Sequence, residues 1–212
     1  MFSFSEEERN QLIIASLIFI FVELSIFQSP FSFLNLFFTG LTADLSPLIQ
    51  TIIDLCIIGI LSFPLFLLHE LAHKFIAIRL GFPSRFYLDQ RMALYSLLSI
   101  FFPIKIIAPG AVIFYGTPSE EAEASIAMAG PLINIILGGI LLGISFFLSS
   151  NWMIFPLIVS KFSFDLALFN LLPISILDGA KIRKWNSNVF LVIFIFTVTA
   201  WLFHPFGLLG EL

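Results

Sequence analysis

Residues 47–80 read PLIQTIIDLCIIGILSFPLFLLHELAHKFIAIRL, and this apolar stretch decides the fold. The length of this stretch exceeds the roughly 20 residues that a membrane-spanning helix needs. Near its end stands the pattern His-Glu-x-x-His, formed by His69, Glu70 and His73. On a helix the two histidines share one face, where they can bind one zinc ion while the adjacent glutamate polarises the zinc-bound water. The stretch therefore predicts a zinc site inside the membrane, near one surface.

The composition is typical of an integral membrane protein. Hydrophobic residues make up 59% of the 212 residues and charged residues 11%, with a mean hydropathy of +1.05. A soluble domain is about 25% charged, so these polar residues are too few to cover a water-facing surface. The net charge of −4 argues against binding to nucleic acid.

Further apolar stretches predict an all-helical membrane protein with five to six crossings in a single domain, residues 1–212. The five clear spans are about 12–27, 47–80, 117–150, 152–177 and 189–209. Glu23 lies within the first span. Because a charged side chain is costly in lipid, we expect Glu23 to face the helix bundle or the membrane interface. The third span opens with a predicted capping box in which Thr117 is the cap and Glu120 the third helical residue. Gly81 is predicted to cap the end of the second span.

The segment 92–115 is apolar but is interrupted by Pro103, Lys105, Pro109 and Gly110. Basic residues follow both the second and the fourth span, so an even number of crossings between them is favoured. We expect a re-entrant or edge-lying β-hairpin here, with a strand at 111–115 where β-branched and aromatic residues gather. The basic residues from Lys74 to Arg91 and from Lys181 to Lys184 predict a cytoplasmic N-terminus and an external C-terminus.

Two histidines leave a catalytic zinc ion short of its third protein ligand. The candidates in or beside the spans are Glu23, Asp54, Asp165, Asp178 and His204. Asp54 is roughly 22 Å along the helix from His69, and Asp165 can pair with Lys161 four residues before it. Asp178 is favoured, since it lies at the basic end of its span, on the side of the two histidines. Gly179 would let the backbone turn there, and Pro64 and Pro173, each five residues before a ligand, would bend the helices.

Three separated segments resemble the site-2 protease family of intramembrane zinc metalloproteases. They are HELAH at 69–73, GPLIN at 130–134, and NLLP at 170–173 with LDG at 177–179. The similarity covers the core, about residues 48–182, with peripheral helices at about 12–27 and 189–209. It implies a three-helix catalytic core and a strand-forming loop, which would be residues 107–116. This chain is similar to a minimal form without PDZ or CBS domains.

The resemblance also implies the site and its chemistry. One Zn²⁺ per chain would be held by His69, His73 and Asp178, with Glu70 as general base. Asn134 and Asn170 would contact the substrate backbone or support the site, although a hydrogen bond between helices is an alternative for both. The expected function is a zinc metalloendopeptidase that cleaves transmembrane segments of other proteins within the bilayer of a prokaryotic cell.

Two other functions remain open. One is a zinc transporter, because one transporter family carries a His-Glu-x-Pro-His-Glu run in a membrane helix. Here Ala72 replaces the proline and Lys74 the second glutamate, and further ligands along a pathway are lacking. The other is a non-catalytic homologue that binds membrane helices, against which the intact Glu70 argues. The sequence leaves the substrate, its regulation and the oligomeric state open.

Overall fold

The computed structural model describes residues 4–27, 46–102, 105–174 and 176–205. It is mostly helical with one two-stranded sheet, as the sequence predicted. In chain order the elements are α1 (Glu6–Phe27), α3 (Ser46–Arg79), β1 (Ser84–Leu88), α4 (Gln90–Leu98), η1 (Ser99–Phe101), β2 (Gly110–Phe114), α5 (Glu120–Ser145), α6 (Ser150–Asn170), α7 (Asp178–Trp185) and α8 (Ser187–Leu202).

Among the described residues, three helices are long and apolar enough to cross a membrane. They are Leu55–Arg79 within α3, Glu120–Ser145 as α5, and Trp152–Asn170 within α6. The chain is therefore an integral, multi-pass membrane protein. Helix α8 is apolar but shorter, and α1 begins with three glutamates. Residues 28–45 and the last four residues of the predicted fifth span lie outside the described residues.

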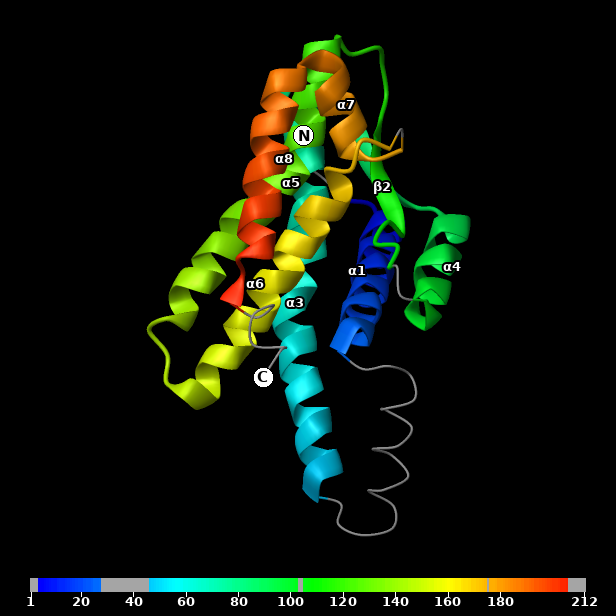
Figure 1. The fold of residues 1–212 in the computed structure, drawn as a ribbon. Coiled ribbons are helices and arrows are strands. Elements are labelled where there is room, and N and C mark those ends of the chain that lie inside the picture. The colour runs from blue at the N-terminus through cyan, green and yellow to red at the C-terminus, as the bar shows by residue number, and fades with distance from the viewer. Residues whose placement is uncertain (1–3, 28–45, 103–104, 175, 206–212) are drawn as a thin grey trace.

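Helix α3 stands at the centre of the bundle (Figure 1). Helices α5 and α6 pack against α3 and against each other, while α8 packs against α6 and α7. Helix α1 lies on the other side of α3, where it also contacts β1 and α4. The core fills with apolar residues of α1, α3 and α6, among them Phe19, Phe66 and Phe162. Glu23 is fully buried in the bundle, as its cost in lipid predicted.

Strands β1 and β2 pair antiparallel, with Ser84 opposite Phe114 and Leu88 opposite Gly110. The strand predicted at 111–115 is thus confirmed within one residue. The extent of the predicted hairpin was wrong, because its first strand lies upstream of residue 92. Residues 90–98 instead form α4, whose first turn is capped by the Asp89 side chain.

Two helix ends differ from the positions predicted from the sequence, and the residues near each end explain why. The fourth span ends at Asn170 rather than Leu177, since Pro173 lacks an N–H and excludes the helical conformation for the residue before it. Pro173 therefore lies between helices and bends neither, whereas Pro64 does lie inside α3. The cap of α5 is Ser119, which accepts the Ala122 N–H, so the predicted Thr117 capping box was wrong.

Candidate metal centre

Helix α3 places His69 and His73 on one face, and both side chains are buried. Their Nε2 atoms lie 3.0 Å apart. The Nδ1 atom of His69 lies 2.6 Å from Asn134 Oδ1, and that of His73 lies 2.7 Å from the Ile126 carbonyl oxygen. Both partners can only accept here, so each Nδ1 carries the proton and each Nε2 keeps its lone pair. The two Nε2 atoms are therefore prepared as metal ligands.

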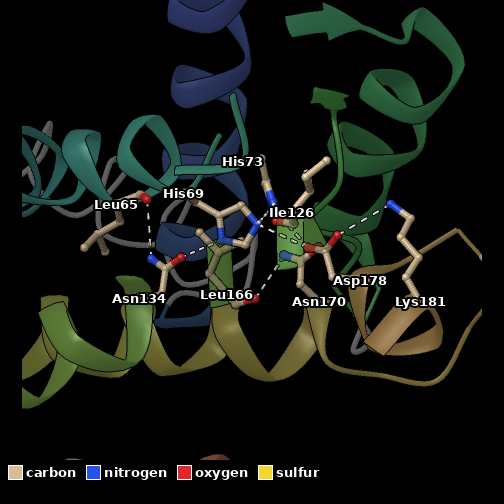
Figure 2. Close-up of polar contacts among 9 residues, drawn as sticks. All are labelled: Leu65, His69, His73, Ile126, Asn134, Leu166, Asn170, Asp178 and Lys181. Carbon is tan, nitrogen blue, oxygen red and sulfur yellow. Dashed lines mark hydrogen bonds and ion pairs between the residues drawn. The ribbon is translucent and has the colours of Figure 1, made fainter. Parts of the chain in front are cut away.

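Asp178, the first residue of α7, completes a cluster of three possible ligands. Its Oδ2 atom lies 3.6 Å from His69 Nε2 and 3.2 Å from His73 Nε2. Two atoms bound at about 2.0–2.1 Å to a tetrahedral zinc ion lie about 3.3 Å from each other, so the observed separations fit such an ion. Among the described residues, these three side chains form a buried His-His-Asp group that could hold a metal ion. Figure 2 shows the three side chains converging, with Lys181 beyond Asp178.

The charge of Asp178 suits a metal ligand. Burial raises the pKa of its carboxyl group, but the neighbouring imidazoles and the Lys181 ammonium outweigh burial and hold the pKa below its usual range. The Lys181 Nζ atom lies 3.6 Å from Asp178 Oδ1. From the sequence alone, Lys181 indicates only the topology of the chain. Its position three residues after Asp178 places both side chains on one face of α7.

Two glycines allow the helices to approach at the centre. A Cβ atom on Gly130 of α5 would lie 2.2 Å from His73 Nε2 and 2.6 Å from His69 Nε2. A Cβ atom on Gly179 of α7 would lie 2.1 Å from the Leu171 carbonyl oxygen. The sequence suggested that Gly179 allows a sharp backbone turn, but its φ is not positive. A glycine is needed at this position because the backbone packs closely against the end of α6.

Glu70 is buried beside the ligands and faces the sheet. Val112 of β2 lines the same cavity as Glu70, and the Glu70 Oε2 atom has no hydrogen-bond partner among the described residues. The cavity here measures about 60 Å³ and is lined partly by His69, Glu70, His73, Val112, Asn170 and Asp178. Since a site for one water needs about 10–15 Å³, water fits beside Glu70, but a peptide would require opening.

The two asparagines occupy different positions. Asn134 is fully buried, and its Nδ2 atom lies 3.3 Å from the Leu65 carbonyl oxygen and 3.4 Å from Ser163 Oγ. Its Oδ1 holds His69, so it supports the site (Figure 2). Asn170 is half-buried, donates to the Leu166 carbonyl oxygen at 3.0 Å, and lines the cavity. Contact with substrate stays a prediction, and Asn170 is the better placed of the two.

The other ligand candidates have different surroundings. Asp165 pairs with Lys161, as predicted, and also accepts the Trp201 indole N–H. His204 is fully buried, and its Nε2 lies 3.1 Å from Ser160 Oγ. Glu23 is buried without a hydrogen-bond partner among the described residues. None of these groups belongs to the His-His-Asp cluster. The side chain of Asp54 lies outside the described residues.

The fold and the three buried ligand atoms define a membrane protein with a candidate metal centre. Two proteins of Methanocaldococcus jannaschii are similar to it. One, provisionally named a zinc metalloprotease, is 33% identical over 134 residues, which cover 60% of this chain and 69% of that protein. The other, named a zinc metalloprotease, is 30% identical over 130 residues, or 60% of this chain and 33% of that protein. The chain belongs to the family of these zinc metalloproteases. No family model and no solved structure matches it.

Proposed function

We propose that this chain is a zinc-dependent endopeptidase of the site-2 protease family, acting on membrane-spanning segments of other proteins. The observation that carries the proposal is the burial of His69, His73 and Asp178 beside Glu70, at the end of an apolar helix. Kinship with zinc metalloproteases supports peptidase activity. The apolar helices support a substrate that shares the bilayer. Five crossings, a cytoplasmic N-terminus and a prokaryotic cell membrane belong to the same proposal.

Glu70 serves as the general base in this proposal. The Oε2 atom, which lacks a partner among the described residues, takes a proton from water and later passes it to the leaving amine nitrogen. His69, His73 and Asp178 hold the metal, and Asn134 and the Ile126 carbonyl keep both imidazoles in the binding tautomer. A zinc ion in this place supplies Lewis acidity, which activates water and polarises a peptide carbonyl.

The substrate must lose its helical hydrogen bonds before its peptide carbonyls can be attacked. Strand β2 offers a replacement, since an extended peptide can add to a free strand edge. Gly110, Ala111, Val112 and Phe114 of β2 line the cavity. Glu70 lines the same cavity, so a peptide paired with β2 would run beside the base. Asn170, in the same cavity, is placed to bind the peptide backbone.

Zinc content and cleavage together test the proposal. Purified protein should hold about one zinc per chain by elemental analysis, and the His69→Ala, His73→Ala double variant should lose it. Glu70→Gln should keep the zinc and the fold but lose cleavage of a membrane-spanning substrate, because only the base is removed. Glu121→Gln, at an exposed position on α5, is the control and should cleave normally. Undiminished metal in the double variant, or near-normal cleavage by Glu70→Gln, would refute the proposal.

A further inference from the structure

Side chains of α1 close the outer edge of strand β1. The Phe86 backbone N–H donates to Glu8 Oε1 at 2.7 Å, and the Leu88 N–H donates to Gln11 Oε1 at 3.1 Å. Glu8 and Gln11 lie three residues apart on α1 and so share one face. In an antiparallel pair, alternate residues of a strand bond to its partner. The amides bound by α1 are therefore those that β2 does not use.

Glu8 also ties this edge to the helix that carries the histidines. The Lys74 Nζ atom lies 2.6 Å from Glu8 Oε1 and 2.7 Å from Glu8 Oε2, and both side chains are buried. Lys74 directly follows His73, and its own carbonyl oxygen lies 3.4 Å from Ser84 Oγ at the start of β1. A buried ion pair with a further hydrogen bond holds its three elements in one arrangement. Glu8 therefore fixes how the sheet stands against α3.

The opposite edge of the sheet faces the candidate metal centre. Val112 lies opposite Phe86 in the register, so its amide points away from β1. Val112 and its neighbours in β2 line the cavity that also holds Glu70. An exposed strand edge accepts any extended chain that reaches it. With β1 closed by Glu8 and Gln11, the edge left for an added strand is β2, beside the base.

We propose that Glu8 and Gln11 are positioning residues that direct an extended substrate to β2 by occupying the outer edge of β1. Glu8, through Lys74, also sets the distance of the sheet from α3. This inference rests on the proposed protease function. Neither residue touches the ligands or Glu70, so their loss should change where and how tightly a peptide binds rather than the chemical step.

Paired variants separate the hydrogen bond from the ion pair. Lys74→Met with Glu8→Gln removes both charges but keeps a side-chain oxygen for the Phe86 amide. Lys74→Met with Glu8→Ala removes the charges and that oxygen, and leaves no buried unpaired charge. Gln11→Ala removes the acceptor of the Leu88 amide alone and leaves the ion pair intact. Glu6→Gln, exposed on the same turn as Glu8, is the control for helix charge.

The first readout is hydrogen exchange of the β1 amides, which needs no activity. The Phe86 amide should be protected in the wild type and in Glu8→Gln/Lys74→Met, and should exchange about tenfold faster in Glu8→Ala/Lys74→Met, the equivalent of one hydrogen bond. Gln11→Ala should do the same at Leu88. Zinc content should be unchanged in all variants. Equal exchange in the two double variants would overturn the assignment of Glu8, whatever the protease assays give.

The second readout is where a substrate binds. A membrane-spanning synthetic peptide with a photo-reactive benzoylphenylalanine at its centre should cross-link to β2 in the wild type and to both strands in Glu8→Ala/Lys74→Met. A peptide bound at β1 lies away from Glu70, so kcat and KM for a cleavable peptide should fall together in that variant, with kcat/KM within about threefold of the wild type. Cross-linking to β1 in the wild type would overturn the inference. Correct cross-links without cleavage would count against the proposed function alone.

Discussion

Replacing Gly130 with alanine tests whether the bare backbone of α5 shapes the metal centre. The new methyl carbon would lie 2.2 Å from His73 Nε2, 2.6 Å from His69 Nε2 and 2.7 Å from His69 Cε1. Both Nε2 atoms are the proposed zinc ligands, and the imidazole rings are held from behind by Asn134 and the Ile126 carbonyl. The rings therefore cannot withdraw from the methyl group without breaking those hydrogen bonds.

The required displacement is large for a metal site. Restoring a normal contact of about 3.5 Å moves the methyl carbon and His73 Nε2 apart by about 1.3 Å. Zinc ligands tolerate about 0.2 Å, and overpacking of a filled interior costs about 1–3 kcal/mol in stability. We expect Gly130→Ala to lose at least about 100-fold in zinc affinity, or about 2.8 kcal/mol at about 1.4 kcal/mol per tenfold change. Cleavage should fall with the loss of zinc.

The assay is zinc retention against a series of chelator concentrations, with cleavage of a membrane-spanning peptide measured in parallel. Gly139→Ala is the matched control, because a Cβ atom there meets nothing within 4 Å. That variant should keep its zinc and gain up to about 1 kcal/mol in stability from better helix propensity. The reasoning would be refuted if Gly130→Ala bound zinc within about threefold of the wild type, or if both alanine variants lost zinc equally.

Three further predictions concern the same site and its membrane. Asn134→Ala should weaken zinc binding about 10–100-fold, because it removes the hydrogen-bond acceptor that orients the ligand His69. Unchanged zinc affinity in a chelator titration would contradict this supporting role of Asn134. Asp178→Ala should lose zinc and activity, whereas Asp165→Ala should keep zinc but unfold at lower temperature; the reverse order in elemental analysis would reopen the choice of third ligand. Residues 179–188 and the N-terminus should react with reagents on the cytoplasmic side, and the C-terminus on the other; labelling of single cysteines from each side checks this.

The sequence was most informative where one element carries the whole signal. His69 and His73 depend only on helical spacing, so their shared face follows from the sequence. The strand at 111–115 could be predicted because β-branched and aromatic residues form a local pattern. Asp178 could not be predicted from helical spacing alone, since it comes close to the histidines only when the start of α7 lies beside α3. The family resemblance and its position beside basic residues pointed to it.

Features that arise between elements could not be predicted in the same way. The Ile126 carbonyl has no side-chain signal at all, yet it orients His73. Gly130 lies inside the GPLIN motif, but a glycine is needed there because the α5 backbone approaches the two imidazoles too closely for a Cβ atom. No local sequence pattern reveals such a contact. Strand β1 was missed because its register depends on β2 and on Glu8 of α1, 78 residues from Phe86 along the chain. Only the packed structure brings such groups together.

Helix α5 provides none of the three ligands, yet it defines the metal centre. Ile126, Gly130 and Asn134 follow one another at intervals of four residues, so they form one stripe along α5. Along α3 in the opposite direction, the matching stripe is His69 and His73. Asn134 holds His69, Ile126 holds His73, and Gly130 lies against both Nε2 atoms. The stripe thus offers an amide, a bare backbone position and a carbonyl to the two rings. The interface of two antiparallel helices therefore selects the tautomer of both imidazoles, and α7 then adds the carboxylate.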